Sequence, residues 1–420
     1  MLDRFAPTLR WIDAQADAMA DQVRAMARIN SGSYHVAGLD ACAHAIARAA
    51  GTIGDLQVEP LAPHRQIDSA GGQIERPLGQ LIRAARRPQA RLQVLLCIHY
   101  DTVYDAEDPF QTVTEVTPGV VRGPGVTDAK GGLVVMLTAL EALERSPFAE
   151  GIGWEMIINP DEEIGSPGSA PLLAEAAARH DLGLLFEPSL PDGSLVSARK
   201  GSGNFIFVVR GKAAHAGRNP DDGRNAIHAL GSVITAVAAM HRSMPGITTN
   251  VGQITGGGAV NVVPDMAIAR CNIRVSSAVE RQHVEAVLRC VVEQVSARDG
   301  FHAELHGDFH APPKETDGPT LQLLSHLADC GREIGLDLAW KSTGGACDGN
   351  KLAAAGLPNV DSLGVRGGAI HSDQEYLHLD SLVERAKLSA LLLMRLAAGD
   401  IPWPHRARRP AATGKGLTCS

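Results

Sequence analysis

The chain has 420 residues, 45% of them hydrophobic and 20% charged, which is typical of a globular protein with more than one domain. Its net charge of -8 argues against nucleic acid or an anionic membrane as the main partner. The N-terminus lacks the apolar core of a signal peptide, and no stretch approaches the roughly 20 apolar residues of a membrane span. Seven cysteines without a CxxC pair are typical of a reducing compartment, so we expect a cytoplasmic protein without a nucleic-acid or membrane partner.

The first 200 residues carry the pattern of an α/β fold. Apolar positions at helical spacing predict helices over 12–28 and 39–50. The runs "RLQVLLCI", "GWEMIINP" and "LGLLF" are typical of strands buried on both faces, and "DAKGGLVVMLTALEALER" is typical of a helix that opens with Asp128. Strands that alternate with helices indicate a mostly parallel central sheet flanked by helices, in which sites gather at the carboxyl ends of the strands.

A different pattern runs from about residue 201 to 312. It predicts an α+β unit of two helices and about four strands, large enough to be a domain of its own. The candidate metal ligands lie on both sides of this unit and not within it. We therefore expect a split catalytic domain, residues 1–200 and 313–399, that carries an inserted lid domain, and we expect the Pro-rich basic tail 400–420 to be disordered.

Hard metal ligands follow the predicted strands and loops of the catalytic domain. Zinc binds histidine nitrogen and carboxylate oxygen, and two metal ions close together need a bridging ligand. The pair His99 and Asp101 suits such a site, because alternate residues that leave a strand point the same way and a metal-bound histidine is usually oriented by a carboxylate. Together the segments predict a hydrolase that activates water with two metal ions, and its candidate residues are His99, Asp101, Asp128, Glu162, Glu163, Glu187 and His371.

Each of these residues has an ordinary structural interpretation when it is taken alone. Asp128 before a helix is typical of an N-cap, and "DEE" is usually a solvated acidic loop. His371 in the polar segment "HSDQEY" has the surroundings of a surface histidine, and Glu187 those of a loop acid. Their joint order along the chain is what favours a metal site.

In this order the segments "HYDTV", "GVTDAKGG", "DEEIGS", "FEP" and "HS" resemble the binuclear zinc aminoacylase and carboxypeptidase family. That family includes bacterial glutamate carboxypeptidase, acetylornithine deacetylase and succinyl-diaminopimelate desuccinylase, and the resemblance covers roughly residues 29–396. It implies a split catalytic domain with an inserted lid that also forms a homodimer. It also implies two divalent metal ions, zinc in the family, although cobalt or manganese fits the same ligands.

The resemblance assigns a role to each candidate. Asp128 would bridge the two ions, with one ion completed by His99 and Glu187 and the other by Glu163 and His371. Glu162 would be the general base, and Asp101 would orient His99.

For residues of the lid, only the resemblance predicts a role. "GKAAHAGRNPDDGRNAIHAL" implies that His215 stabilises the oxyanion in the active site of the neighbouring subunit, although the residue alone suggests an ordinary strand histidine. "VNVVPDMAIARCNIRV" implies that Asn261 and Arg274 hold the substrate carboxylate, a task that suits a guanidinium. "STGGACDGN" implies a backbone contact to substrate at Gly345.

One segment departs from the glutamate-releasing relatives. They carry an arginine where the chain leaves the lid, and this sequence has "GDFHAPPKE" there, with His310 as the substitute contact. Strict glutamate specificity is therefore not predicted.

The sequence thus predicts a metal-dependent hydrolase that cleaves the amide bond of an N-acyl amino acid or small peptide with a free carboxylate. A dipeptidase and an N-carbamoyl-amino-acid hydrolase on the same scaffold stay open as alternatives. A catalytically silent, metal-stabilised binding protein is the alternative of a different class, and the complete set of ligands and base argues against it. A nucleotide-binding protein is disfavoured, because the glycines match neither GxxxxGK[ST] nor GxGxxG.

Overall fold

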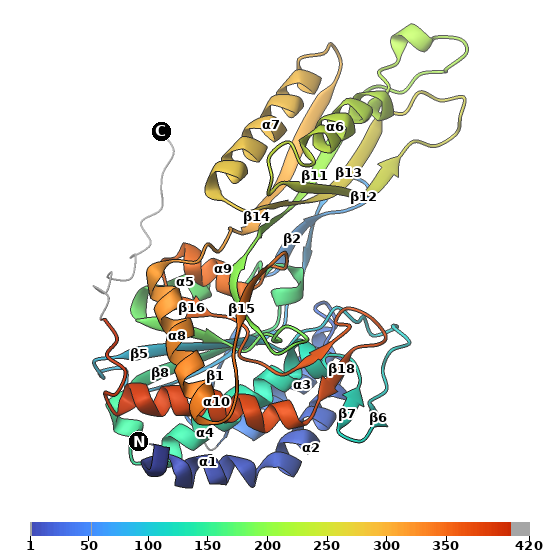
Figure 1. Cartoon of the computed structure of the whole chain (residues 1–420). Helices are drawn as coiled ribbons and strands as arrows, with labels where there is room; N and C mark the ends of the chain where they lie inside the picture. Colours follow the sequence, from blue (N-terminus) through green and yellow to red (C-terminus); the bar gives the residue numbers. More distant parts are fainter. Residues whose placement is uncertain (1, 52, 405–420) are drawn as a thin grey trace.

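The computed structural model describes residues 2–51 and 53–404 of the chain. Figure 1 shows two bodies, a larger one that contains both ends of the described chain and a smaller one that is inserted between β10 and α8. We call the smaller body, from β11 to β14, the lid. No helix among the described residues has the length and apolar character that crossing a membrane requires.

A six-stranded mixed sheet forms the centre of the larger body. Its four strands from β8 to β16 run parallel, and β1 and β4 pair antiparallel at one edge. Every residue of β5 and β8 is buried, which explains why these strands are nearly continuous apolar runs in the sequence. In order across the sheet the strands are β1 (Gln57–Pro60), β4 (Gln80–Arg86), β8 (Gly153–Asn159), β5 (Gln93–His99), β9 (Leu182–Leu185) and β16 (Asn359–Val360).

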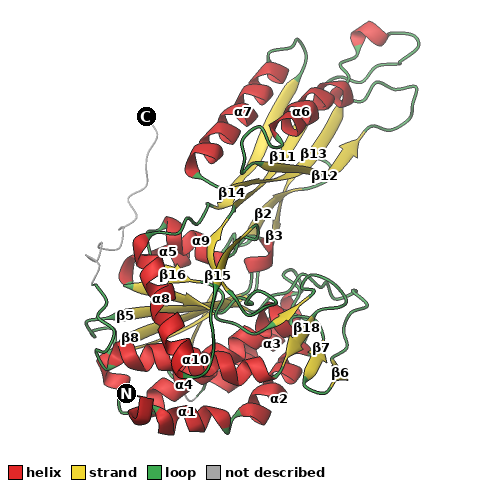
Figure 2. Ribbon diagram, in the orientation of Figure 1, coloured by secondary structure: helices red, strands yellow, loops and turns green. Residues whose placement is uncertain are grey.

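Helices cover both faces of this sheet, as Figure 2 shows. Alternate residues of β5 enter different cores: Leu96 belongs to the core that contains residues of α1, α2, α3, α4, α8 and α10, and Leu95 to the core that contains residues of α5 and α9. The helix predicted over 12–28 is two helices, because the chain breaks at Ala14 and Gln15. The helices are α1 (Ala6–Asp13), α2 (Ala16–Ala27), α3 (Val36–Ala50), α4 (Gly132–Arg145), α5 (Ala170–Arg179), α8 (Gly318–Glu333), α9 (Asp348–Ala354) and α10 (Asp380–Ala397).

The lid has the two helices and four strands that the sequence predicts. Its sheet is antiparallel, and both helices lie on one face over a hydrophobic core separate from those of the larger body. Its elements are β11 (Gly201–Arg210), α6 (Ala226–Met240), β12 (Thr248–Gly256), β13 (Met266–Val275), α7 (Ala278–Ser296) and β14 (His302–Ala311), with the strands in the order β12-β13-β11-β14.

The lid joins the larger body through two adjacent chain segments. Arg199 and Lys314 exchange backbone hydrogen bonds of 2.9 and 3.0 Å just before β11 and just after β14. Both side chains are buried against Asp361, with Arg199 Nε at 2.8 Å and Lys314 Nζ at 2.6 Å from its carboxylate oxygens. This arrangement fixes the root of the lid to the end of β16.

A hairpin of the larger body also reaches the lid. It consists of β2 (His64–Ile67) and β3 (Gln73–Arg76), and Figure 1 shows it beside the lid sheet. Arg270 Nη2 donates to the carbonyl oxygens of Ile67 at 2.6 Å and Asp68 at 3.0 Å, and Arg210 Nη2 donates to that of Gly71 at 3.1 Å. Gly71 has a φ of 71° and packs closely against Arg210, so the hairpin tip suits glycine. This support was not predicted from the sequence.

Short strands complete the larger body around the site. β10 (Leu195–Arg199) pairs parallel with β15 (Trp340–Thr343). A small sheet joins segments far apart in the chain, in the order β17 (Gly367–Gly368), β18 (Tyr376–His378), β7 (Val120–Arg122) and β6 (Thr114–Thr117). The predicted disordered tail 400–420 begins too early, because Ile401 and Trp403 are buried. Residues 405–420 lie outside the described residues.

Candidate metal centre and active site

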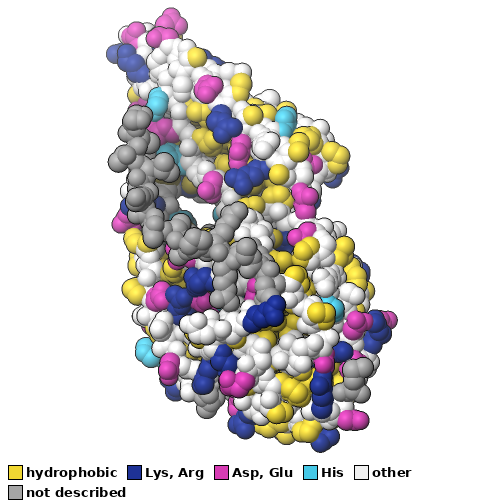
Figure 3. All heavy atoms as spheres, turned by 90° about the vertical axis from the view of Figure 1, so that its left-hand side faces the viewer, with side chains coloured by type: hydrophobic (Ala, Val, Ile, Leu, Met, Phe, Trp, Pro, Cys, Tyr) yellow, Lys and Arg dark blue, Asp and Glu magenta, His cyan; other side chains and the backbone are white. Residues whose placement is uncertain are grey.

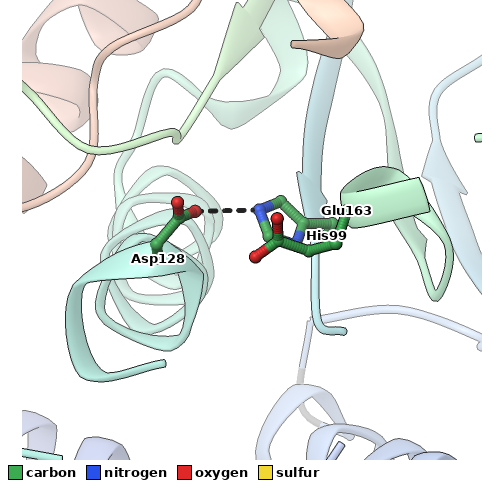
Figure 4. Close-up of side chains that lie close together, drawn as sticks. All are labelled: His99, Asp128 and Glu163. Carbon is green, nitrogen blue, oxygen red and sulfur yellow. Dashed lines mark hydrogen bonds and ion pairs between the residues drawn. The ribbon is translucent and has the colours of Figure 1, made fainter. Parts of the chain in front are cut away.

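Three of the predicted ligands meet at the carboxyl end of the central sheet. His99, Asp128 and Glu163 each offer one ligand atom, and these atoms lie within 4.8 Å of one another (Figure 4). His99 ends β5, Asp128 lies in the irregular turn η2 (Val126–Gly131), and Glu163 lies in the short helix η4 (Glu162–Ile164) after β8.

The local backbone explains how Asp128 reaches this place. Its φ of -115° and ψ of 90° are not helical, and its peptide bond to Ala129 is cis. Helix α4 therefore begins only at Gly132, and Asp128 is not the helix opener that the sequence suggested. A Cβ at Gly132 would collide with the carbonyl oxygen of Phe186, so glycine lets this helix start against the end of β9, next to Glu187.

The carboxylate of Asp128 lies between the two predicted histidines. Its Oδ1 lies 3.1 Å from His99 Nε2, and its Oδ2 lies 3.3 Å from His371 Nε2. Glu187 Oε2 lies 3.5 Å from the same nitrogen of His99, and Glu163 Oε2 lies 3.3 Å from that of His371. The five residues therefore form two groups of three that share one carboxylate.

These residues fit a pair of divalent metal ions. Ligand atoms at about 2.0–2.2 Å around a tetrahedral zinc ion lie roughly 3.3–3.6 Å from one another. The four nitrogen–oxygen distances of 3.1 to 3.5 Å match that spacing in both groups. Imidazole and carboxylate are also the donors that zinc, cobalt and manganese accept.

The electrostatics of the cluster favour added positive charge. Burial raises the pKa of Glu163 to about 7, and the Asp128 carboxylate adds to the effect. Hydrogen bonds to Asp128 and Glu163 raise the pKa of His371 to about 11. Burial opposes protonation of His99, but Glu187 and the other carboxylates around it outweigh burial and raise its pKa well above the usual value. The acids here exceed what two histidines can neutralise, as is common where metals bind.

Asp101 supports the candidate ligands His99 and Glu163 through its carboxylate. Its Oδ1 lies 3.3 Å from His99 Nδ1, which fits the predicted orienting role. The same carboxylate accepts the backbone N–H groups of Glu162 at 3.1 Å and Glu163 at 3.2 Å, and the hydroxyl of Ser33 at 2.7 Å. One buried acid thus fixes a ligand and the turn that carries two further site residues.

Two cavities open beside the cluster, and Glu162, Glu163, His371 and Arg274 line both. Burial and the neighbouring Glu187 raise the pKa of Glu162 well above its usual value. The larger cavity, about 310 Å³, has an apolar wall made by Leu190, Pro191, Val196 and Ile370, and it includes Gly345. The smaller cavity, about 190 Å³, is polar and is lined by Ser202, Asn204, Asn272, His310 and Lys351.

The cationic groups of the smaller cavity differ in their partners. Lys351 Nζ donates to Asp348 at 2.8 Å, so its charge is balanced. Arg274 Nη1 donates to the carbonyl oxygen of Gly344 at 2.5 Å, and no ion pair of Arg274 with a carboxylate is found within the described part of the chain. Burial, with Lys351 and Arg274 nearby, lowers the pKa of His310 to about 4, so this imidazole is neutral.

Two predicted site residues do not lie at this site. Arg274 pairs with Ser202 at the near end of β11, whereas His215 follows the far end of that strand and pairs with Val262. Ten residues of strand span about 30 Å. Asn261 accepts a backbone hydrogen bond from Ala216 beside His215. Figure 1 shows both segments, 211–225 and 257–265, at the tip of the lid.

Glu375, which was not predicted from the sequence, supports the turn that carries the candidate ligand Asp128. Its buried carboxylate accepts the backbone N–H groups of Gly125, Thr127 and Asp128 at 2.8 to 3.1 Å. The residue lies in the polar segment after His371, which carries no periodicity, so nothing in the sequence marked it as buried.

The fold and this cluster define the class of the protein. The carboxyl ends of a parallel set of strands present two ligand groups that share a carboxylate, beneath a second α+β body. This is the architecture of a metal-dependent hydrolase with a lid.

Comparison with known proteins gives the family. The family model for peptidase family M20/M25/M40 matches residues 95–395, and the chain belongs to that family. Its members are hydrolases that act on peptides or acyl amino acids and typically depend on two metal ions.

Individual relatives are distant. The chain is 28% identical to carboxypeptidase G2 of Pseudomonas sp. (strain RS-16) over 73% of its own length and 74% of the relative. It is 27% identical to succinyl-diaminopimelate desuccinylase of Acinetobacter baylyi over 69% and 78% of the two chains. Among solved structures, the dipeptidase Dug1p of Saccharomyces cerevisiae superposes with a TM-score of 0.71 at 15% identity, covering 95% of this chain and 99% of that one. This last similarity concerns the fold alone.

Proposed function

We propose that this protein hydrolyses the amide bond of an N-acyl amino acid or small peptide that carries a free carboxylate. The single observation that carries the proposal is the position of Asp128, whose two oxygens face two separate histidines. We assign the two groups, which share Asp128, to two divalent ions, zinc in the first instance. When bound, the ions would polarise the scissile carbonyl and lower the pKa of the attacking water.

Glu162 is the general base of the proposed reaction. It lines both cavities beside the candidate ligands, and no hydrogen bond or ion pair joins its carboxylate to either histidine among the described residues. Its carboxylate takes a proton from the attacking water and passes it to the leaving amine. A base whose carboxylate prefers to carry a proton is suited to that transfer, and burial gives Glu162 this preference.

The two cavities indicate where the different parts of the substrate would bind. The free carboxylate would bind Arg274, since this guanidinium has no carboxylate partner among the described residues and lines both cavities. The small polar cavity would take the side chain of the released amino acid, with His310 and Lys351 as contacts. The apolar wall of the larger cavity would take the acyl group, and Gly345 would contact it through its backbone.

The lid tip carries features of a dimer interface. Strand β12 is an edge of the lid sheet, and Ile254 on this strand is exposed. Val260 and Val262, beside Asn261 and His215, are exposed as well. We propose a homodimer through the lid in which His215 and Asn261 complete the partner subunit's active site, His215 as oxyanion stabiliser and Asn261 at the substrate carboxylate.

One face of the molecule agrees with a small-molecule or short-peptide substrate. On the face in Figure 3, Lys and Arg side chains alternate with Asp and Glu, without a patch of one sign. Nucleic-acid binding needs such a basic patch. We also propose a cytoplasmic location, supported by the six free cysteines of the described residues.

The test is a substrate panel with a metal control. Protein stripped with chelator and then loaded with zinc is expected to hydrolyse N-acyl amino acids, and the stripped protein is expected to be inactive. Matched pairs such as N-benzoyl-glutamate with N-benzoyl-glutamine, and each free acid with its carboxyl amide, report on the polar cavity and on Arg274. Equal rates for free acids and carboxyl amides would contradict the assignment of Arg274. Absence of turnover across the panel, with two ions bound, would contradict the substrate class.

The role of His215 is tested by mixing two inactive variants. Glu162→Gln and His215→Ala chains are refolded together, so that hybrid dimers form. If His215 acts in the partner's active site, each hybrid has one complete site, and the mixture recovers about a quarter of wild-type activity. If His215 acts within its own chain, the mixture stays as inactive as its components. Gel filtration of each variant shows whether the dimer itself has formed.

A further inference from the structure

Glu375 is a buried carboxylate on which four donors converge. Its Oε1 accepts the backbone N–H groups of Thr127 at 2.8 Å and Asp128 at 3.0 Å. Its Oε2 accepts the N–H of Gly125 at 3.1 Å and the hydroxyl of Tyr104 at 2.8 Å. Three of these four donors belong to one irregular turn, and that turn carries the Asp128 carboxylate.

The turn depends on this carboxylate because its own backbone is not regular. Gly125 has a φ of 70°, and Asp128 and Ala129 have non-helical angles, so helical hydrogen bonds cannot satisfy the N–H groups there. Buried N–H groups in native proteins almost always have a partner. Glu375 supplies that partner for three of them, and it thereby sets the direction of the Asp128 side chain.

The same residue ties the turn to His371. The Glu375 N–H donates to the carbonyl oxygen of Ser372 at 3.1 Å, and the Tyr104 hydroxyl, whose single proton is shared with Glu375 Oε2, lies 2.9 Å from the same oxygen. In return, Gly123 donates its N–H to the carbonyl oxygen of Glu375 at 3.2 Å. His371 precedes this loop with a left-handed φ of 62°. The two ligands, Asp128 and His371, are thus held in one hydrogen-bonded unit.

The other ligand group has a separate support. His99 ends a central strand and is held by Asp101, and Glu187 follows the neighbouring strand β9. Glu375 contacts neither residue in the contacts found among the described residues. Loss of Glu375 would therefore leave His99 and Glu187 in place, so that their group is disturbed only through Asp128, whereas the group that faces Glu163 is disturbed through both Asp128 and His371.

We propose that Glu375 is a positioning residue that makes the group of Asp128, Glu163 and His371 competent to bind its metal ion. This inference rests on the two-metal site of the proposed function. The proposal predicts a selective effect: loss of Glu375 lowers the affinity for the ion at His371 far more than the affinity for the ion at His99. Loss of a residue that hydrogen-bonds to a metal ligand typically lowers metal affinity by about 10–100-fold.

The test compares Glu375→Gln with Glu155→Gln in chelator-stripped full-length protein, titrated with Co²⁺ by calorimetry and absorbance. Glu155 is another buried carboxylate, bonded to Arg83 and Arg179 and remote from the site. Glu375→Gln presents an amide N–H₂ to N–H donors. It is expected to lower the affinity for the ion at His371 (the second ion) by at least about tenfold and the affinity for the ion at His99 (the first ion) by less than about threefold. Glu155→Gln is expected to lower Tm and leave both affinities unchanged.

Tyr104→Phe is the milder variant, which keeps the proposal testable if Glu375→Gln does not fold. It removes one donor and the tie to Ser372, so a smaller selective loss of the second ion is expected. Unchanged affinities in Glu375→Gln or Tyr104→Phe, or equal losses of both ions, would overturn the inference while the proposed function stands. Wild-type protein that binds no second ion would overturn both.

Discussion

Replacing Glu162 with Gln is expected to lower kcat by roughly a thousandfold, since a positioned acid–base residue typically contributes 10²–10⁴-fold. Gln keeps the size of the side chain but cannot take a proton from water or deliver one to the leaving amine. Both metal ions should still bind, because Glu162 is not in either ligand group. The backbone N–H of residue 162 would still donate to Asp101, so the turn η4 keeps its shape.

The measurement is kcat and KM on the best substrate of the panel, together with metal content. The matched control is Glu141→Gln on α4, where the carboxylate pairs with Arg145. That variant should retain wild-type kcat. A Glu162→Gln enzyme with near-normal kcat and two bound ions would rule Glu162 out as the base.

Asp128→Asn should have the second large effect, on metal binding itself. The amide keeps one acceptor oxygen for one histidine and turns an N–H₂ group toward the other, so one of the two ions loses its shared ligand. We expect the affinity for at least one ion to fall by more than about a hundredfold, above the range for partners that do not touch the metal. Turnover should fall with it.

Metal stoichiometry after gel filtration, with an activity assay, decides this prediction. Asp348→Asn is the control, because Asp348 is equally buried and accepts hydrogen bonds from Ser166, Asn159 and Lys351 without facing either histidine. Asp348→Asn should lower Tm and still bind two ions. Two tightly bound ions in Asp128→Asn would contradict the shared-ligand arrangement.

The gathering of the candidate ligands was predictable because chain order and sheet geometry agree. His99, Glu163 and Glu187 each end or closely follow a buried apolar run, and parallel strands bring such positions to one edge. The lid elements were predictable for a similar reason, since their strands and helices have clear periodicities. The periodicity of the lid elements is a local signal, and the gathering of the candidate ligands depends on a rule that holds for all parallel sheets.

Contacts between distant, non-periodic segments were not predictable. Glu375 is about 250 residues from the turn it supports, in a polar segment whose letters suit the surface equally well. The hairpin tip at Gly71 binds two arginines of the lid through backbone carbonyls, which leave no mark in the sequence. The position of Asp128 was predicted, but its non-helical backbone was not, because the apolar run after it reads as one helix.

The placement of His215 and Asn261 shows a different limit. A sequence describes one chain, and a residue at the tip of the lid is far from the metal ligands of that chain. The proposed role of His215 requires a second copy of the chain, so the mixing experiment, and not the geometry of one chain, tests that role.

The fixed root of the lid has a mechanical consequence. Arg199, Lys314 and Asp361 hold the two connecting segments together, so a rotation of the lid about this root would move it as a lever and would also shift its contacts with the hairpin of β2 and β3. Arg274 lies on its short arm, one strand pair from the root, and the tip segment lies on the long arm, about 30 Å away. A turn of about 10° that a substrate carboxylate induces at the short arm would carry the tip through about 5 Å. A small rotation beside Arg274 would thereby become a displacement of several ångströms at the tip of the lid.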